Sequence, residues 1–196
     1  MGGGVKFMNK DYVYVHFFEK NKLKLLFDGA NIKFSKEILE FIFLIEDEDN
    51  KIATFAFFST VKKILKDKFN LDLNKLFFDE TGFPNISKYF ISFSMKNNVW
   101  GFALSTQPIG LSIVSDSYLK TVNLEIEESR IDNFPLLLAD TIAYSKLIKH
   151  PFTEEMLYKK ELNFCSKLCC LKCKNEDEYA VLATKFPYAK SELKIN

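Results

Sequence analysis

The feature that most constrains this chain is a set of three apolar runs separated only by short polar turns. The runs are rich in aromatic and β-branched residues, which are typical of strands. Strands joined by turns this short pair antiparallel with their neighbours. We therefore expect a β-meander with strands at residues 89–95 (YFISFSM), 99–105 (VWGFALS) and 108–114 (PIGLSIV).

The segments before the meander predict two strands followed by two helices. Residues 12–18 (YVYVHFF) are aromatic and β-branched, and residues 22–29 follow after a charged turn, so this pair is expected to form a hairpin. Ser35 can cap a helix at residues 36–48. Apolar residues at helical spacing predict a second helix at residues 52–69.

The segments after the meander predict one helix and a closing hairpin. The helix is expected at residues 134–150, and the hairpin strands within 156–175 and 178–186. The order of strands, helices, strands, helix and strands indicates the α+β class. We expect a short tail followed by two similar lobes, with boundaries at residues 1–9, 10–84 and 85–190.

The balance of charges argues against a nucleic-acid partner. Charged residues make up 27% of the chain, yet the net charge is only +1. Arg130 is the one arginine, so a phosphate site would depend on lysines, backbone amides or hydroxyls.

No apolar run approaches the roughly 18–20 residues of a membrane span. The start, MGGGVKF, lacks the apolar segment of a secretory signal, and we expect a cytoplasmic protein without a membrane span.

The two histidines, His16 and His150, do not predict a catalytic site. His16 alternates within an aromatic strand, and His150 stands at a helix end before a proline. A single histidine in such a place usually packs in the core or lies at the surface. Dinucleotide-binding, P-loop and nucleophile-elbow motifs are also missing from the sequence.

The four cysteines are close together in the sequence and permit two interpretations. They could form a zinc or redox site, or they could be small hydrophobic residues of a strand. On one strand Cys165, Cys169 and Cys173 would share a face but spread along it, and Cys170 would point away. Because a tetrahedral site needs converging ligands, a cysteine-centred metal-binding module is kept only as a second alternative.

The run TGFPNISKYFISFSMKNNVWGFALSTQPIGLSIV (81–114) has the order of a known family pattern. That pattern is a Gly-Lys-Pro turn, a Ser-His-Ser strand, a strand with an aromatic residue and a Pro-Ile-Gly strand with two carboxylates. The run resembles the 4'-phosphopantetheinyl transferase superfamily, specifically the two-lobed type that primes peptide and polyketide synthases. Residues 54–78, 134–149 and 178–186 fall where the family has matching segments. The resemblance implies two pseudo-symmetric lobes, each with an antiparallel sheet and a packed helix.

The metal-binding and histidine positions of that pattern are changed in this chain. Ser112 and Val114 stand where the family has the Asp and Glu that hold a metal ion. Phe93 replaces the histidine, although the flanking serines remain as Ser92 and Ser94, and these two are the candidates for contacts to a cofactor. A hydroxyl is a weak ligand for Mg²⁺ and a valine is none.

The positions that grip coenzyme A in the family are changed as well. Ala53 stands in place of an arginine, and Phe83 in place of the lysine in the turn. In the helix at 134–149, Asp140 could substitute for the family's glutamate, and Lys146 or Lys149 for its lysine. No single register restores both, and Lys149 is kept as a weak candidate for cofactor binding.

These losses predict a protein that binds without catalysing. Phosphopantetheine transfer requires Mg²⁺ to neutralise charge on a pyrophosphate, and carboxylates hold the ion. We expect a non-catalytic protein without a cofactor, whose partner is a carrier protein, another protein or a second copy of itself. The alternative is an atypical active transferase that uses Mg²⁺ and coenzyme A, with replacement carboxylates from Asp116, Glu125, Glu127 or Asp140.

Overall fold

The computed structural model describes residues 12–26, 33–78, 84–96, 98–115, 142–143, 146, 165–172, 177–184 and 190–195. Helices and strands are both present, and most of the strand pairs are antiparallel. The helical elements are α1 (Lys20–Leu26), α2 (Lys36–Phe43), α3 (Glu48–Phe69) and the short 3₁₀ turn η1 (Leu73–Lys75). The strands are β1 (Tyr12–Glu19), β2 (Leu76–Phe78), β3 (Pro84–Ile86), β4 (Tyr89–Lys96), β5 (Val99–Ser105), β6 (Ile109–Ser115), β7 (Cys165–Lys172), β8 (Asp177–Thr184) and β9 (Lys190–Ile195).

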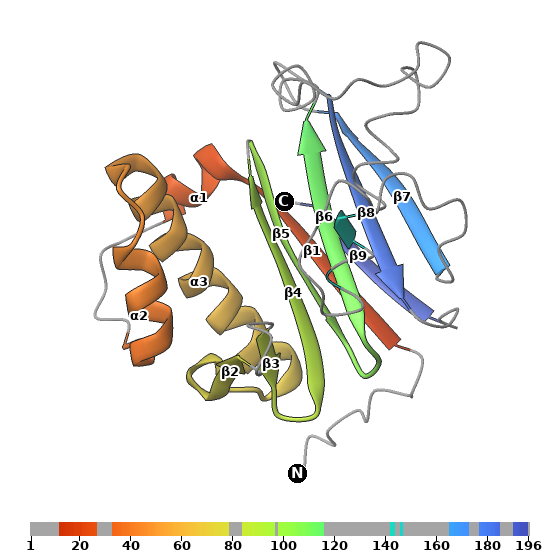
Figure 1. The fold of residues 1–196 in the computed structure, drawn as a ribbon, viewed down its shortest axis with the longest axis horizontal. Coiled ribbons are helices and arrows are strands. Elements are labelled where there is room, and N and C mark those ends of the chain that lie inside the picture. Colours follow the sequence, from red (N-terminus) through yellow and green to blue (C-terminus); the bar gives the residue numbers. More distant parts are fainter. Residues whose placement is uncertain are drawn as a thin grey trace.

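The described strands form two sheets. The larger has the order β2-β3-β4-β5-β1-β9, and the smaller has the order β6-β8-β7. In the larger sheet β1 runs antiparallel to β5 and parallel to β9. The sheet therefore places β1, from near the start of the chain, between strands from its middle and its end (Figure 1).

The elements stack as three layers, with α1–α3 on one face of the larger sheet and the smaller sheet on the other (Figure 1). Alternate residues of each strand point to opposite faces, so β1 contributes to both cores. Tyr14 and Phe18 belong to the helix-side core, together with Phe57, Leu65 and Phe102. The inter-sheet core consists of Val13, Val15, Phe17, Val99, Ala103, Ile109, Leu111, Ile113, Ala180 and Leu182.

Helix α3 has the end signals of a stable helix. Asp47 caps its start, with Oδ1 accepting a hydrogen bond of 2.6 Å from the backbone N–H of Asn50. Asn70 ends it in the left-handed conformation, at φ 53°. The prediction of a helix ending at residue 69 is confirmed, although α3 begins four residues earlier than expected. The expected helix at 36–48 ends sooner, at Phe43, because the cap at Asp47 starts a new helix.

The expected strand at residues 22–29 is wrong, because Lys20–Leu26 form helix α1. The alternation of lysine and leucine suggested a strand, but both residue types also favour helices. In the helix Leu23 is fully buried in the helix-side core, while Leu25 is 86% exposed. Burial of Leu23 in this core favours the helical conformation of this segment.

The meander strands are confirmed, but the third strand does not pair with the second. β4 and β5 form a hairpin in which Lys96 faces Val99, whereas β6 pairs with β8 in the smaller sheet. The other edge of β5 is occupied by β1, whose Phe17 faces Gly101. A Cβ added to Gly101 would lie 2.8 Å from Cδ1 of Phe17, so the glycine permits this close pairing.

The C-terminal hairpin is confirmed, since β7 and β8 pair antiparallel. Strand β9 was not expected, and it adds a parallel edge strand next to β1. Strands from both sides of the expected boundary at residue 84 share the larger sheet. Of the expected helix at 134–150, only residues 142, 143 and 146 are described, and they are helical. Among the described helices, none is both long and apolar enough to cross a membrane.

Candidate functional site

Ser92 and Ser94, which flank Phe93 in the sequence, join the two sheets. Both are buried on β4, and both hydroxyl oxygens accept hydrogen bonds from the backbone of β6. The N–H of Leu111 donates to Oγ of Ser92, and the N–H of Ile113 donates to Oγ of Ser94, each at 3.0 Å. The serine side chains thus satisfy backbone groups of β6 on the side where none of the described strands pairs with it.

Phe93 lies between these serines in the sequence and points to the opposite face of the sheet, toward α3. Its ring centre is 6.0 Å from that of Phe57 and 5.5 Å from that of Phe58, both in edge-on geometry. Such aromatic pairs add to the energy of apolar burial. Phe93 is therefore part of the apolar packing against helix α3.

Lys146 brings the C-terminal helical segment to the same place. Its ammonium donates to the carbonyl oxygen of Phe93 at 2.8 Å and to that of Leu111 at 2.6 Å. The lysine bridges β4 and β6, close to the two serine contacts. Lys146, one of the two lysines considered from the sequence, therefore lies near Ser92, Phe93 and Ser94. The other lysine, Lys149, and the candidate carboxylate Asp140 lie outside the described residues.

Ser112 and Val114 are each only 2% exposed. They lie on β6, opposite Val181 and Tyr179 of β8. A carboxylate at either position would lose most of its hydration. Within the described part of the chain, no group of three or more His, Cys, Asp or Glu side chains is placed to hold a metal ion.

The remaining sequence candidates divide between the packed core and the undescribed segments. Ala53 is fully buried on α3. His16 is buried, 2.8 Å from the hydroxyl of Tyr14, and stacks on Phe18. Cys165, Cys169 and Cys170 belong to β7. The candidates outside the described residues are Phe83, Asp116, Glu125, Glu127, His150 and Cys173.

A small apolar pocket of about 160 Å³ lies beside Phe93. Helix α2 contributes Ile38 and Phe41 to its wall, and β2 contributes Leu76 and Phe78. Lys146 also reaches this pocket. Phe41 and Phe78 are 41% and 43% exposed, so two of its aromatic lining residues are open to solvent. The pocket is suited to an apolar group rather than to a nucleotide phosphate.

A second, more polar pocket of about 460 Å³ shares Phe41 and Met95 with the first. It lies where α1 meets the start of α3. Its polar lining residues are Lys20, Asn50 and Thr54, and its other walls are Ile45 and Trp100. The ammonium of Lys20 is 5.8 Å from the centre of the Trp100 ring.

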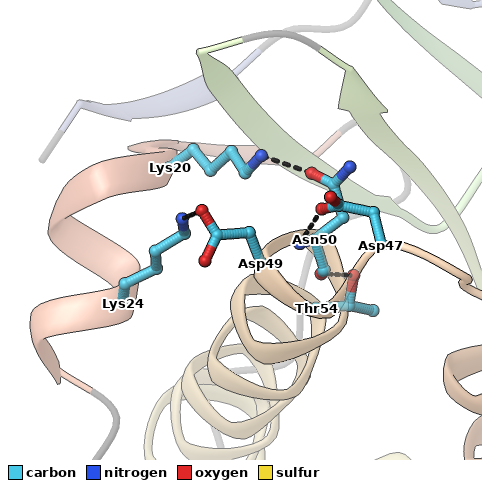
Figure 2. A network of polar contacts seen from close by, with 6 residues as sticks. All are labelled: Lys20, Lys24, Asp47, Asp49, Asn50 and Thr54. Carbon is cyan, nitrogen blue, oxygen red and sulfur yellow. Dashed lines mark hydrogen bonds and ion pairs between the residues drawn. The ribbon is translucent and has the colours of Figure 1, made fainter.

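Figure 2 shows the polar contacts that organise this second pocket. Lys20 donates to the amide oxygen of Asn50, and Thr54 donates to the backbone carbonyl of Asn50 at 2.7 Å. Lys24, one turn further along α1, binds Asp49 at 2.7 Å. These contacts connect α1 to the first turn of α3.

The charges at this junction shift two pKa values. Burial lowers the pKa of Lys20, and the charge of Lys24 lowers it further, whereas Asp47 and Asp49 act in the opposite direction. The hydrogen bond from Lys24 lowers the pKa of Asp49, with a further contribution from the charge of Lys24. Lys20 is thus a partly desolvated cation, and Asp49 is held in its ionised form.

The residues of the second pocket were not predicted from the sequence. Lysines at positions 20 and 24 are four residues apart and would lie on one side of a helix. That signal was hidden because residues 22–29 were expected to be a strand. Asn50 and Trp100 carry no local pattern that marks them, since only the tertiary fold brings them together.

Comparison with known proteins does not assign the chain to a family. No family model matches the sequence, and no curated protein matches it either.

Proposed function

We propose that this chain is a non-catalytic binding protein built on a framework like that of the 4'-phosphopantetheinyl transferases, and that its partner is a protein. The observation that carries the proposal is the use of the polar residues beside Phe93. Ser92, Ser94 and Lys146 all bond to the backbone of the two strands. Side chains engaged in this way hold the sheets together and have little capacity left for a pyrophosphate.

The chemistry of the transfer supports the same conclusion. The leaving nucleotide develops charge that a carboxylate-held Mg²⁺ must neutralise. At the two positions where the family carries these carboxylates, the chain has the buried Ser112 and Val114. Removing one electrostatic contact of this kind typically costs about 3 kcal/mol in the transition state. Several removed together would eliminate most of the rate enhancement.

A protein partner is supported by the aromatic residues around the apolar pocket. Phe41 and Phe78 line it, and both side chains are exposed. Exposed aromatic side chains next to a pocket are typical of surfaces that bind an apolar anchor of another protein. A carrier protein is the partner class that the resemblance suggests.

A loading assay tests the absence of catalysis. The purified chain is incubated with Mg²⁺, coenzyme A and an apo carrier protein, and the mass of the carrier is measured. We expect no gain of the phosphopantetheine mass above a reaction without enzyme, while an authentic transferase loads the same carrier. Loading above background would refute the proposal and favour the atypical transferase.

Binding is measured separately with the same carrier, fluorescently labelled, by anisotropy. If the carrier binds at this pocket, Phe78→Ser weakens it by about tenfold or more, as loss of an aromatic anchor does. The matched control is Leu25→Ser, which changes an exposed leucine on α1 that does not line the pocket.

A further inference from the structure

The pocket between α1 and the start of α3 has the size of a small-molecule site. Its volume of about 460 Å³ lies within the range of ligand pockets in proteins. Trp100, Met95 and Phe41 form apolar walls, and Lys20 and Asn50 supply polar groups. In such pockets a small number of polar groups fixes the orientation of the ligand.

The charge of Lys20 points to the class of ligand. Its hydrogen-bond acceptor is the amide oxygen of Asn50, which is neutral. Among the described residues the ion pairs involve other lysines, namely Lys22, Lys24, Lys36 and Lys51. A partly buried ammonium with a neutral acceptor can still accommodate an anion.

The neighbouring carboxylates have other partners. Asp49 binds Lys24, and Asp47 caps the start of α3 through Asn50. Both still place negative charge near Lys20 and raise its pKa. This residual charge disfavours a dianionic phosphate and leaves room for a single negative charge.

We propose that this pocket binds a small organic carboxylate with an apolar body about the size of one aromatic ring. The carboxylate lies between the ammonium of Lys20 and the NH₂ group of Asn50. It accepts charge-assisted hydrogen bonds from both groups. The apolar body packs against Trp100, Met95 and Phe41. Thr54 also lines the pocket, and its hydroxyl donates to the backbone carbonyl of Asn50 within α3.

This site is independent of the proposed protein-binding function. Its polar residues come from α1 and α3, whereas the proposed function rests on the contacts between β4 and β6 and on the apolar pocket beside Phe93. The two pockets share only the side chains of Phe41 and Met95. Failure of one proposal therefore leaves the other to be decided by its own experiment.

Trp100 provides a direct test, because it is the single tryptophan of the 196-residue chain. Its emission, excited where phenyl rings do not absorb, is followed while three matched compounds are added to the full-length chain. The compounds are 3-phenylpropanoate, its neutral amide and 3-phenylpropylamine. We expect a saturable change with the acid, an affinity lower by about tenfold or more for the amide, and no saturation with the amine.

The role of Lys20 is tested by Lys20→Met, which keeps an apolar stem but removes the charge. We expect the affinity for 3-phenylpropanoate to fall by about tenfold or more. The control is Lys22→Met on the same helix, whose ammonium pairs with Glu19 and does not line the pocket. It should retain the affinity within about twofold. Affinities are compared rather than emission intensities, because Lys20→Met also alters the surroundings of Trp100.

Three results would overturn the proposal: no saturable change with the acid, equal affinities for acid and amide, or an unchanged affinity in folded Lys20→Met. Circular dichroism establishes whether the variant is folded. If it is not, the comparison of acid with amide on the unchanged chain decides the question.

Discussion

Among single residues, two serine hydroxyls accept hydrogen bonds from backbone N–H groups of β6 that would otherwise pair with a neighbouring strand. The N–H groups of Leu111 and Ile113 point away from β8 and donate to the hydroxyl oxygens of Ser92 and Ser94 on β4. A buried N–H without an acceptor is costly, so these contacts matter for stability. Lys146 does the same for the carbonyl of Leu111.

Replacing one of these hydroxyls should destabilise the fold. In Ser94→Ala the buried N–H of Ile113 loses its acceptor, and we expect the free energy of unfolding to fall by about 1–3 kcal/mol. Urea denaturation followed by circular dichroism measures the change. The control is Ser59→Ala, because its hydroxyl donates only to a carbonyl of its own helix, that of Phe55. Equal losses in both variants would contradict this role for Ser94.

Ser92 and Ser94 could be singled out from the sequence, but not the groups that they contact. The resemblance drew attention to Ser92, Phe93 and Ser94, and it offered Lys146 only beside Lys149 and Asp140. Ser92, Ser94 and Lys146 contact β4 and β6, whereas the Phe93 ring packs toward α3. Their hydrogen bonds depend on β6 leaving the sheet of β4 and β5. No local pattern encodes that change of sheet, so the contacts could not be foreseen.

At the scale of elements, helix α1 shows how tertiary contacts override a local pattern. The segment KLKL fits the period of a strand, yet it is helical because Leu23 packs in the helix-side core while Lys20 and Lys24 reach α3. Helix α3, in contrast, was predictable because its apolar positions recur over many turns and its last turn carries lysines. Long periodic segments are less sensitive to their surroundings than short ones.

The ion pair between α1 and α3 should make stability depend on pH in the acid range. The pKa of Asp49 lies below its ordinary value of 3.8, so the folded state binds the proton less readily than the unfolded chain. The stabilisation is therefore fully present above pH 3.8 and is lost as the pH falls through the folded-state pKa. We expect Asp49→Asn to melt at a lower temperature than the parent at neutral pH, and the difference to vanish in acid.

Thermal melts recorded by circular dichroism from neutral to strongly acid pH measure this difference. Asp67→Asn is the control, because Asp67 lies on the same helix and makes no ion pair with the described residues. A gap between Asp49→Asn and the parent that stays constant down to the lowest pH would exclude the ion pair as its cause.

At the scale of the whole molecule, β1 is the strand that unites the chain. It pairs with β5 on one edge and β9 on the other, and its two faces enter both cores. The α+β class was predictable from the order of the elements. The strand order was not, because neighbours such as β1 and β9 are distant in the sequence and depend on long-range pairing.

Removal of β9 should affect the molecule as a whole. Deleting residues 190–196 would leave one edge of β1 unpaired, and an open edge is a template for pairing with another chain. We expect the melting temperature to fall by roughly 5–10 °C and self-association to appear at high protein concentration. Analytical ultracentrifugation and thermal melts measure both effects.

Deletion of Asn196 alone is the matched control, since this residue follows β9 directly. It should behave as the parent does. A truncated chain that lacks β9 but stays monomeric and melts at the parental temperature would show that β9 contributes little to the sheet.

The pairing of Tyr12 with Lys190 also has a consequence for biosynthesis. A ribosome adds about 5–20 residues per second, so β1 waits on the order of 10–40 seconds before its parallel neighbour emerges. During that time one edge of β1 has no partner strand and is exposed to other molecules. Chaperones that shield extended apolar segments should therefore engage this protein early in translation and release it only after the last strand has left the tunnel.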